Sequence, residues 1–524
     1  MRHLMTIVLS LGFIVGIFAP ATTQANQTSN EYTVDQVLAA YEAGQFRVIR
    51  TSGEWVTASR DGAYICAEGD GIYRVSDGLF FEQFDRGLFS PNGLYFMENK
   101  DGIYRVSDGV EVVDTPDVAT SQAVFDDSGT YVAISTAGVY RLSDGQQIIA
   151  TSSPEINFSP DGLLAATTDG VFRLSDGQKL LDMNGDYHRP NFSPDGAYVW
   201  SDGVYRLSDG ARLFDVTSRH GVFFTPDMSY AVLLEDGVYR LSDGQRMYSL
   251  TGWVPDFSVP GFSPDGQYMA VEYMGVYRVP DGEKLFDFEE YSIGVRNFQA
   301  AVFSQDSLLI AIANDAVYRL SDGQRLFEVG TVDSSSQFSP DDAYLAADGV
   351  YRVVDGQKLF DSEASHVTFS PNIEYVALDY DGLYRLSDQQ KLFDIVGFVQ
   401  SFSMAGEYIA VGLYDLDFSI YRVSDVHQYR GLNPLHIPAG ITAIGNTVLV
   451  VDLTQQGQQL PVIYTDVDDA RFYEGPGEGY EFSQIRSGQY LVALSIEDDW
   501  YQVNVKGDIG WLAPNTGIRF SIPE

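Results

Sequence analysis

A short phrase that recurs eleven times along the chain limits its possible folds more than any other feature. Each copy holds a small residue, a β-branched residue or leucine, an aromatic residue, Arg, then Leu or Val, and an Asp two positions later. The aromatic residues of the eleven copies are Tyr73, Tyr104, Tyr140, Phe172, Tyr205, Tyr239, Tyr277, Tyr318, Tyr351, Tyr384 and Tyr421. Their mean spacing of about 35 residues is typical of one supersecondary unit stacked many times. The repeat therefore predicts a tandem scaffold and favours a binding protein over an enzyme.

One repeat, between residues 190 and 215, predicts four short strands separated by three tight turns. The turns are indicated by Pro-Asp-Gly at 194–196 and by Asp-Gly at 202–203 and 209–210. The first expected strand ends at Phe192. The other three cover residues 197–200, 204–207 and 212–216. Four antiparallel strands joined in this way form one meander.

Both faces of such a meander are apolar, which decides how the repeats must be arranged. Side chains alternate along a strand, so Val204 and Arg206 share one face while Tyr205 and Leu207 share the other. A sheet with two apolar faces needs a neighbour on each side, and stacking the sheets around an axis provides both. The prediction is an all-β fold, a β-propeller built from about eleven four-stranded repeats of about 35 residues.

A second phrase leads to a family resemblance. Phe-Ser-Pro-Asp-Gly stands at Phe158, Phe192 and Phe262, and a strand and then the aromatic-Arg-Leu-x-Asp strand follow it. This order resembles the WD40-like propeller repeats of the PD40 and TolB type over residues 46–428, although Ser stands where the family has Trp before the Asp. The resemblance implies a β-propeller, in one large ring or two smaller rings, and says little about function because propellers host many functions.

Each copy of the repeat also holds an Arg followed three residues later by an Asp. The series runs from Arg74 and Asp77 through Arg206 and Asp209 to Arg422 and Asp425. One interpretation is a ring of charge lining a channel or a ligand site. The other is structural, with the Arg bonded to turn carboxylates or carbonyls and the Asp fixing the hairpin. Presence in every repeat favours the structural role, since a binding site normally breaks the symmetry.

The N-terminal residues indicate export. Arg2 precedes an apolar run at 4–18, and small residues follow at 23–25, which together predict a signal peptide over residues 1–25. The alternative, an uncleaved membrane anchor, is disfavoured because a spanning helix needs roughly 20 apolar residues. Residues 26–45 are predicted to be a short helical leader. The expected location is therefore secreted or in the cell envelope, with no membrane span after signal removal.

The C-terminal part follows another pattern. Residues 429–460 are predicted to be a connector or a degenerate blade. In residues 461–524, Gly-Pro-Gly at 475–477, Trp-Tyr-Gln-Val at 500–503 and Gly-Trp-Leu at 510–512 come in that order. This order closely resembles bacterial SH3 (SH3b) domains, which are small β-barrels. The resemblance implies attachment to an exported bacterial protein and binding of cell-wall peptide or glycan.

A groove in this SH3-like domain is the candidate ligand site. Its candidate residues are Tyr473, Tyr480, Trp500, Tyr501 and Trp511. Each is also a plausible core residue of so small a barrel. Of these, Tyr473 and Tyr480 are favoured for the groove, and Trp500 and Trp511 for the core. The residues at 471–474 depart from the pattern that precedes Gly-Pro-Gly in the family, so an inherited ligand specificity does not follow.

Composition excludes several classes of partner and chemistry. The formal net charge is −41, which opposes binding to nucleic acid and to anionic lipid. Cys66 is the only cysteine, so no intrachain disulfide forms. The six histidines show no metal-ligand spacing, and no Gly-x-Ser-x-Gly nucleophile motif occurs. We therefore predict no catalytic residue, no metal and no cofactor.

These observations predict an exported, non-catalytic bacterial envelope protein. The propeller would act as a scaffold for a protein or ligand, and the SH3-like domain would bind cell-wall peptide or glycan or a partner protein. The alternative is a glycan-active hydrolase or lyase on a propeller scaffold. Such an enzyme needs polar residues that depart from the repeat, and the inserts at 184–189, 217–220 and 288–296 are where they would lie.

Overall fold

The computed structural model describes residues 34–521 apart from short gaps, of which 288–300 and 431–440 are the longest. This described part consists almost wholly of β-strands, with one α-helix and one 3₁₀ turn. Eleven four-stranded antiparallel sheets, one seven-stranded sheet and one five-stranded sheet make up its architecture. The predicted all-β class and the four-stranded repeat are thereby confirmed.

One repeat shows how the residues form these sheets. Its strands are β18 (Asn191–Phe192), β19 (Tyr198–Trp200), β20 (Gly203–Arg206) and β21 (Ala211–Asp215). They pair in chain order, so the sheet is a simple meander. Val199 faces Tyr205 in the register of the two central strands, and both are buried. The observed strands lie within a residue or two of those expected from the turn pattern.

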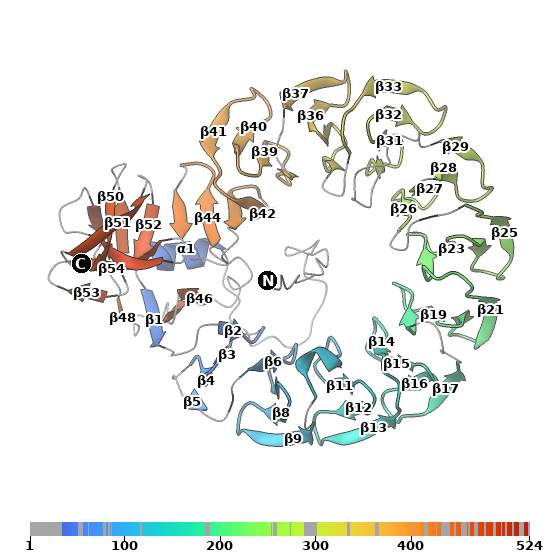
Figure 1. Cartoon of the computed structure of the whole chain (residues 1–524), viewed down its shortest axis with the longest axis horizontal. Coiled ribbons are helices and arrows are strands. Elements are labelled where there is room, and N and C mark those ends of the chain that lie inside the picture. The colour runs from blue at the N-terminus through green and yellow to red at the C-terminus, as the bar shows by residue number, and fades with distance from the viewer. Residues whose placement is uncertain are drawn as a thin grey trace, which may run out of the picture.

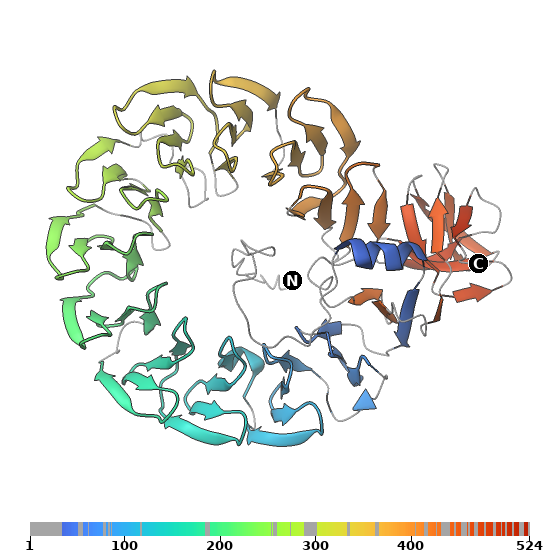
Figure 2. The ribbon, with the colours of Figure 1, turned by 180° about the vertical axis from the view of Figure 1, so that it is seen from behind.

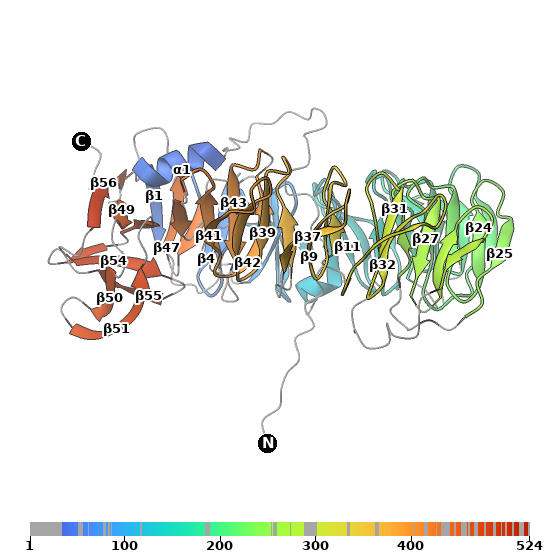
Figure 3. The same cartoon turned by 90° about the horizontal axis from the view of Figure 1, so that it is seen from above.

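Ten of the four-stranded sheets are made of consecutive strands and surround a common axis (Figure 1). Seen from behind, the same sheets follow one another in a continuous arc (Figure 2). The ring is flat when it is seen from its side (Figure 3). The ten sheets, from β2–β5 to β38–β41, span residues 56–81, 87–114, 123–150, 156–182, 191–215, 223–249, 261–286, 301–328, 337–361 and 367–394.

The ring is completed by a sheet that joins the two ends of the described chain. Strand β1 (Gln45–Arg50) lies between β47 (Thr447–Val451) and β48 (Gln458–Gln459), and β46 (Ile441–Ile444) forms the outer neighbour of β47. Val48 is the register partner of Leu449. Parts of residues 429–460 therefore contribute strands to a sheet that lies between the first and last repeats (Figure 1).

Helix α1 (Val34–Ala43) covers this closing sheet. Its side chains of Val37, Leu38 and Ala40 are buried, at intervals that place them on one face of the helix. The helix contacts β1, β47 and β49 (Val462–Thr465). Figure 3 shows it on one face of the ring, above β1 and β47. The leader thus packs on the sheet that holds the first and last strands together.

The apolar core is distributed between neighbouring sheets. One cluster joins Val204 and Phe214 of one repeat to Leu233 and Leu241 of the next. Full burial of a side chain of this size stabilises a fold by about 1.5–3 kcal/mol. Because equivalent clusters recur from junction to junction, each sheet is held by its two neighbours, as the two apolar faces of the repeat require.

The C-terminal strands extend the last repeat. The last meander consists of β42 (Phe398–Phe402), β43 (Tyr408–Gly412), β44 (Phe418–Arg422) and β45 (Gln428–Arg430). Strand β45 pairs in parallel with β52 (Gln489–Val492). Strand β52 pairs in turn with β49, and β49 with β56 (Ile518–Ser521). These strands form the seven-stranded sheet. The C-terminal region is therefore joined to the ring by backbone hydrogen bonds.

The remaining C-terminal strands form the five-stranded sheet, with the order β51-β50-β55-β54-β53. They are β50 (Ala470–Gly475), β51 (Glu478–Ile485), β53 (Ser495–Glu497), β54 (Trp500–Val505) and β55 (Asp508–Leu512). Within the part of the chain that the structure describes, no helix has the length and apolar character needed to cross a membrane.

Candidate functional site

The repeated Arg-x-x-Asp element closes a hairpin in each repeat. Arg206 Nη2 donates to Asp209 Oδ2 at 2.8 Å, and Asp209 Oδ1 accepts the N–H of Ala211 at 3.1 Å. The backbone N–H of Gly210 donates to the Arg206 carbonyl at 2.9 Å, with φ of +70° at the glycine. The Arg206 guanidinium, followed by the Ala211 N–H, holds the pKa of Asp209 below its usual range. These contacts all lie within one turn.

The same ion pair recurs in every repeat whose Arg and Asp the structure describes. The N–O distances are between 2.5 and 3.2 Å, and Arg422 with Asp425 is the last pair. Asp77, the partner expected for Arg74, lies outside the described residues. The ion pair itself is local and serves the turn. Arg206 also reaches the next repeat, because its Nη1 donates to the Ser242 carbonyl at 2.9 Å.

A second repeated contact set was missed by sequence reasoning. The Tyr205 hydroxyl donates to Asp202 at 3.0 Å, and Arg212 forms an ion pair with the same carboxylate at 3.2 Å. The Arg212 guanidinium also lies 5.5 Å from the centroid of the Tyr205 ring. Burial, followed by the bond to Asp202, raises the pKa of Tyr205 to about 12. The pattern that indicates this set is an Asp three residues before the aromatic residue and a cation seven residues after it.

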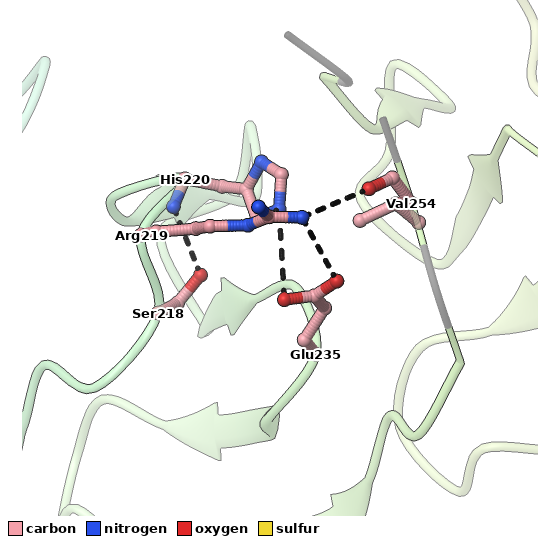
Figure 4. A network of polar contacts seen from close by, with 5 residues as sticks. All are labelled: Ser218, Arg219, His220, Glu235 and Val254. Atoms are coloured by element: carbon pink, nitrogen blue, oxygen red, sulfur yellow. Dashed lines mark hydrogen bonds and ion pairs between the residues drawn. The ribbon is translucent and has the colours of Figure 1, made fainter. Parts of the chain in front are cut away.

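The loop at residues 217–221, one of the three inserts considered from the sequence, breaks the repeat symmetry. It connects β21 to β22 (Phe223–Phe224) and places Arg219 and His220 beside Glu235 of the next repeat (Figure 4). The His220 side chain is only 1% exposed. Of the other two inserts, residues 184–188 and 288–296 lie outside the described residues.

The polar contacts of this loop reach the next repeat and the connection that follows it. Arg219 Nε donates to His220 Nε2 at 3.3 Å, and Arg219 Nη2 donates to Glu235 Oε1 at 3.3 Å and to the Val254 carbonyl at 3.4 Å. The His220 N–H donates to Ser218 Oγ at 3.2 Å. Nδ1 of His220 is buried and has no hydrogen-bond partner among the described residues. A buried polar atom without a partner lowers the stability of a fold by about 1–3 kcal/mol. In this respect the loop differs from the repeated turns, whose Arg and Asp side chains are paired.

One hydrogen bond and two residues with left-handed backbone conformation fix the position of the loop and of Glu235. Thr217 Oγ1 bonds to Asp236 at 3.0 Å, which fixes the loop to the turn of the next repeat. Glu235 has φ of +64°, a left-handed conformation that directs its side chain from that turn. Gly221 has φ of +84°, and a Cβ at this position would lie 2.9 Å from the Trp200 ring. The Trp200 ring therefore leaves no room for a side chain at Gly221.

The C-terminal candidate residues are distributed over the two faces of the five-stranded sheet. Tyr473 is the register partner of Trp511, and Trp511 is the register partner of Gln502. Trp500 lies two residues before Gln502 on the same strand. Because register partners and alternate residues share a face, Tyr473, Trp500 and Trp511 lie on one face of the sheet.

The aromatic face, defined as Tyr473, Trp500 and Trp511, is half-buried. The rings of Tyr473 and Trp500 meet edge to face, with centroids 5.3 Å apart and an interplanar angle of 81°. Sequence reasoning had separated Tyr473, as a groove residue, from the two tryptophans as core residues. The strand register brings the three together.

The other two candidates do not join the aromatic face. Tyr501 is the register partner of Leu512, and it shares the opposite face of the sheet with Leu512 and Val503, which are fully buried. Tyr480 lies on β51, and its side chain is outside the described part of the structure. Tyr501 therefore lies on the face of the sheet that packs into the core.

Comparison with known proteins finds no matching family model and no matching curated protein. Similar solved structures include a crystal structure of a eukaryotic initiation factor, with 16% identity and a TM-score of 0.33 over 55% of this chain and 90% of that chain. Another is the computationally designed Ika8 protein, with 15% identity and a TM-score of 0.29 over 70% of this chain and 99% of that chain. These TM-scores are low, so neither likeness carries an argument about this chain.

Proposed function

We propose that this protein is an exported, non-catalytic protein of the bacterial envelope, in which the ring is a scaffold and the C-terminal region binds cell-wall peptide or glycan. The aromatic face carries the proposal. Three half-buried aromatic side chains from three adjacent strands present rings on one side of the sheet. Large amphipathic rings of this kind contribute strongly to the binding of sugars and peptides.

Two sequence resemblances support the same function. The Phe-Ser-Pro-Asp-Gly repeats are similar to propeller repeats of the PD40 and TolB type, and the Gly-Pro-Gly, Trp-Tyr and Gly-Trp series is similar to SH3b domains. The apolar run at 4–18 supports export. The ring suits a scaffold because its repeated polar side chains are engaged in holding turns.

The enzyme alternative receives no support from the one insert that the structure describes. A catalytic group must touch its substrate, whereas the His220 side chain is almost fully buried. Its neighbours Arg219 and Glu235 bond to each other at 3.3 Å. This cluster therefore suits a structural or regulatory role better than glycan hydrolysis.

The test is co-sedimentation of the whole chain with isolated cell walls. The whole chain is needed because β49, β52 and β56 complete the sheet of the last repeat. We expect the wild-type protein to pellet and the Trp500→Ala and Trp511→Ala variants to lose about tenfold or more in apparent affinity, as for interface aromatic residues.

The matched control is Tyr380→Ala, which removes an aromatic residue that is 48% exposed on the ring. It should pellet like the wild type. Recovery of the wild type in the supernatant, under conditions where a known wall-binding module pellets, would contradict the proposed ligand. Equal pelleting of the wild type and both tryptophan variants would contradict the proposed site.

A further inference from the structure

We propose that the loop at residues 217–221 is a proton-sensitive latch, which holds the turn of the next repeat and the connection after it while His220 is neutral and loosens when His220 is protonated. The inference is independent of wall binding. It rests on the geometry of Arg219, His220 and Glu235 and on the burial of the imidazole (Figure 4).

The hydrogen bonds fix the protonation state of the latched form. Arg219 Nε is a donor and lies 3.3 Å from His220 Nε2, so Nε2 must be the acceptor and carry no proton. The proton of the neutral ring then resides on Nδ1, which is the buried atom without a partner. The latched state is thus a neutral imidazole in a single tautomer.

Protonation removes the bond that defines this state. A protonated imidazole has donors on both ring nitrogens and can no longer accept the Arg219 N–H. It also places a second positive charge beside the guanidinium, in a position that is closed to solvent. Arg219 must then move, and its contact with the Val254 carbonyl moves with it.

The charged groups around the imidazole come from two elements. Arg219 lies on the same loop, and Glu235 faces it from the turn between β23 (Tyr230–Leu233) and β24 (Gly237–Arg240), with Oε2 3.9 Å from Nε2. The Glu235 carboxylate already holds Arg219. After protonation, the imidazolium and the guanidinium both lie beside this carboxylate.

The second acid of that turn is occupied elsewhere. Asp236 accepts from Thr217 at 3.0 Å and from the Tyr239 hydroxyl at 2.9 Å, and it pairs with Arg246 at 2.8 Å. It is therefore engaged by three other groups and does not offset the new charge. The Thr217 contact keeps the start of the loop in place, so the change is confined to residues 218–221 and their partners.

Another loop of the same chain provides a built-in reference. Thr151 bonds to Asp169 at 2.8 Å, as Thr217 bonds to Asp236, but the loop at 151–155 contains no histidine. Both loops connect the fourth strand of one repeat to the first strand of the next. Any response to pH that both loops share is general, and a response of 217–221 alone belongs to the latch.

Hydrogen–deuterium exchange of the whole chain at about pH 5 and pH 8, the range in which an imidazole titrates, tests the proposal. After correction for the intrinsic effect of pH on exchange, we expect peptides covering 217–222 to lose protection by about tenfold or more at the lower pH. The peptide covering 151–155 should not change.

Two variants separate the latch from general acid effects. His220→Gln keeps an acceptor for Arg219 but cannot be charged, so its protection should be the same at both pH values. Arg219→Gln removes the competing cation, so its loop should be less protected than the wild type at pH 8 and show no further loss at pH 5. Equal wild-type protection at the two pH values, or an equal loss in His220→Gln, would overturn the proposal.

Discussion

The rings of Phe214 and Tyr239 stack across the boundary between two repeats, with centroids 4.2 Å apart and an interplanar angle of 18°. Phe214 lies on the fourth strand of one sheet, and Tyr239 belongs to the third strand of the next. Equivalent contacts join Phe286 to Tyr318, Phe327 to Tyr351, Phe360 to Tyr384 and Phe393 to Tyr421. The aromatic residue of the repeated phrase is thus a contact between sheets as well as a member of its own sheet.

Truncating one of these rings should weaken one junction. For Phe214→Ala we expect the free energy of unfolding to fall by about 3 kcal/mol, because a buried ring is lost and a cavity remains. Phe80→Ala is the matched control, since Phe80 is 38% exposed and stacks within its own sheet. Urea denaturation of both variants measures the difference. Equal losses in the two would show that the junction stack is unimportant.

Asp379 gives a pH-dependent prediction. Burial raises the pKa of its carboxyl, while the Val399 N–H, bonded at 2.7 Å, and His366 oppose that shift. An acid with a raised pKa in the folded state destabilises the fold as pH rises above its ordinary value, and this cost is absent below that value. Asp379→Asn keeps the acceptor and removes the charge. We expect it to raise the Tm at pH 7 by more than at pH 3.5.

A natural precedent supports this substitution. Asn99 occupies the equivalent position in another repeat, directly after the second strand, and its Oδ1 accepts the Thr120 N–H at 3.2 Å. The reverse change, Asn99→Asp, should lower the Tm at pH 7. A gain in Tm for Asp379→Asn that is the same at both pH values would contradict the electrostatic explanation.

Ring closure is testable through the backbone of β1. Val48→Pro removes an N–H from a strand with neighbours on both sides and should destabilise the closing sheet by about 3 kcal/mol or more. We expect a larger radius of gyration in small-angle scattering. The control is Val354→Pro, since Val354 is 85% exposed at a turn position where another repeat carries Pro280. A compact Val48→Pro variant would show that β1 is dispensable for closure.

Gly221 links backbone conformation to the Trp200 ring. Gly221→Ala should cost about 1 kcal/mol for a left-handed alanine, plus the displacement of Trp200 by a Cβ at 2.9 Å. Gly69→Ala isolates the first cost, because φ there is +79° and no atom lies within 4 Å of the new Cβ. Thermal unfolding should show the larger loss for Gly221→Ala. Equal losses would mean that Trp200 yields without cost.

Local features were predictable from the sequence, and contacts between repeats were not. The Arg206–Asp209 pair and its Asp-Gly turn involve three residues that are close together in the sequence. The repeated phrase was therefore enough to predict them. The partners of Phe214 and His220 lie in other repeats, and only the relative placement of the sheets selects them. Alternation along β54 was readable in Trp500 and Tyr501, but which face is the core depends on Leu512, a residue of the next strand.

The closing sheet was beyond sequence reasoning for a related reason. Strand β1 carries none of the repeated phrases, and its partner Leu449 lies at the other end of the ring. A sequence pattern that spans a few tens of residues cannot predict a pairing between strands so far apart in the chain. The sequence predicted residues 429–460 as a connector or a degenerate blade, and the structure assigns the strand Thr447–Val451 within them.

We expect the pairing of Val48 with Leu449 to form late in assembly. Contacts between residues so distant in the chain form slowly, because a long loop must first be ordered. Until then the outer flanks of the first and last repeats have no cover and expose apolar surface to proteases and to other chains. The maturation rate of the whole protein should therefore be governed by the joining of its two ends, and accessory factors that shield those flanks would increase the yield of intact rings.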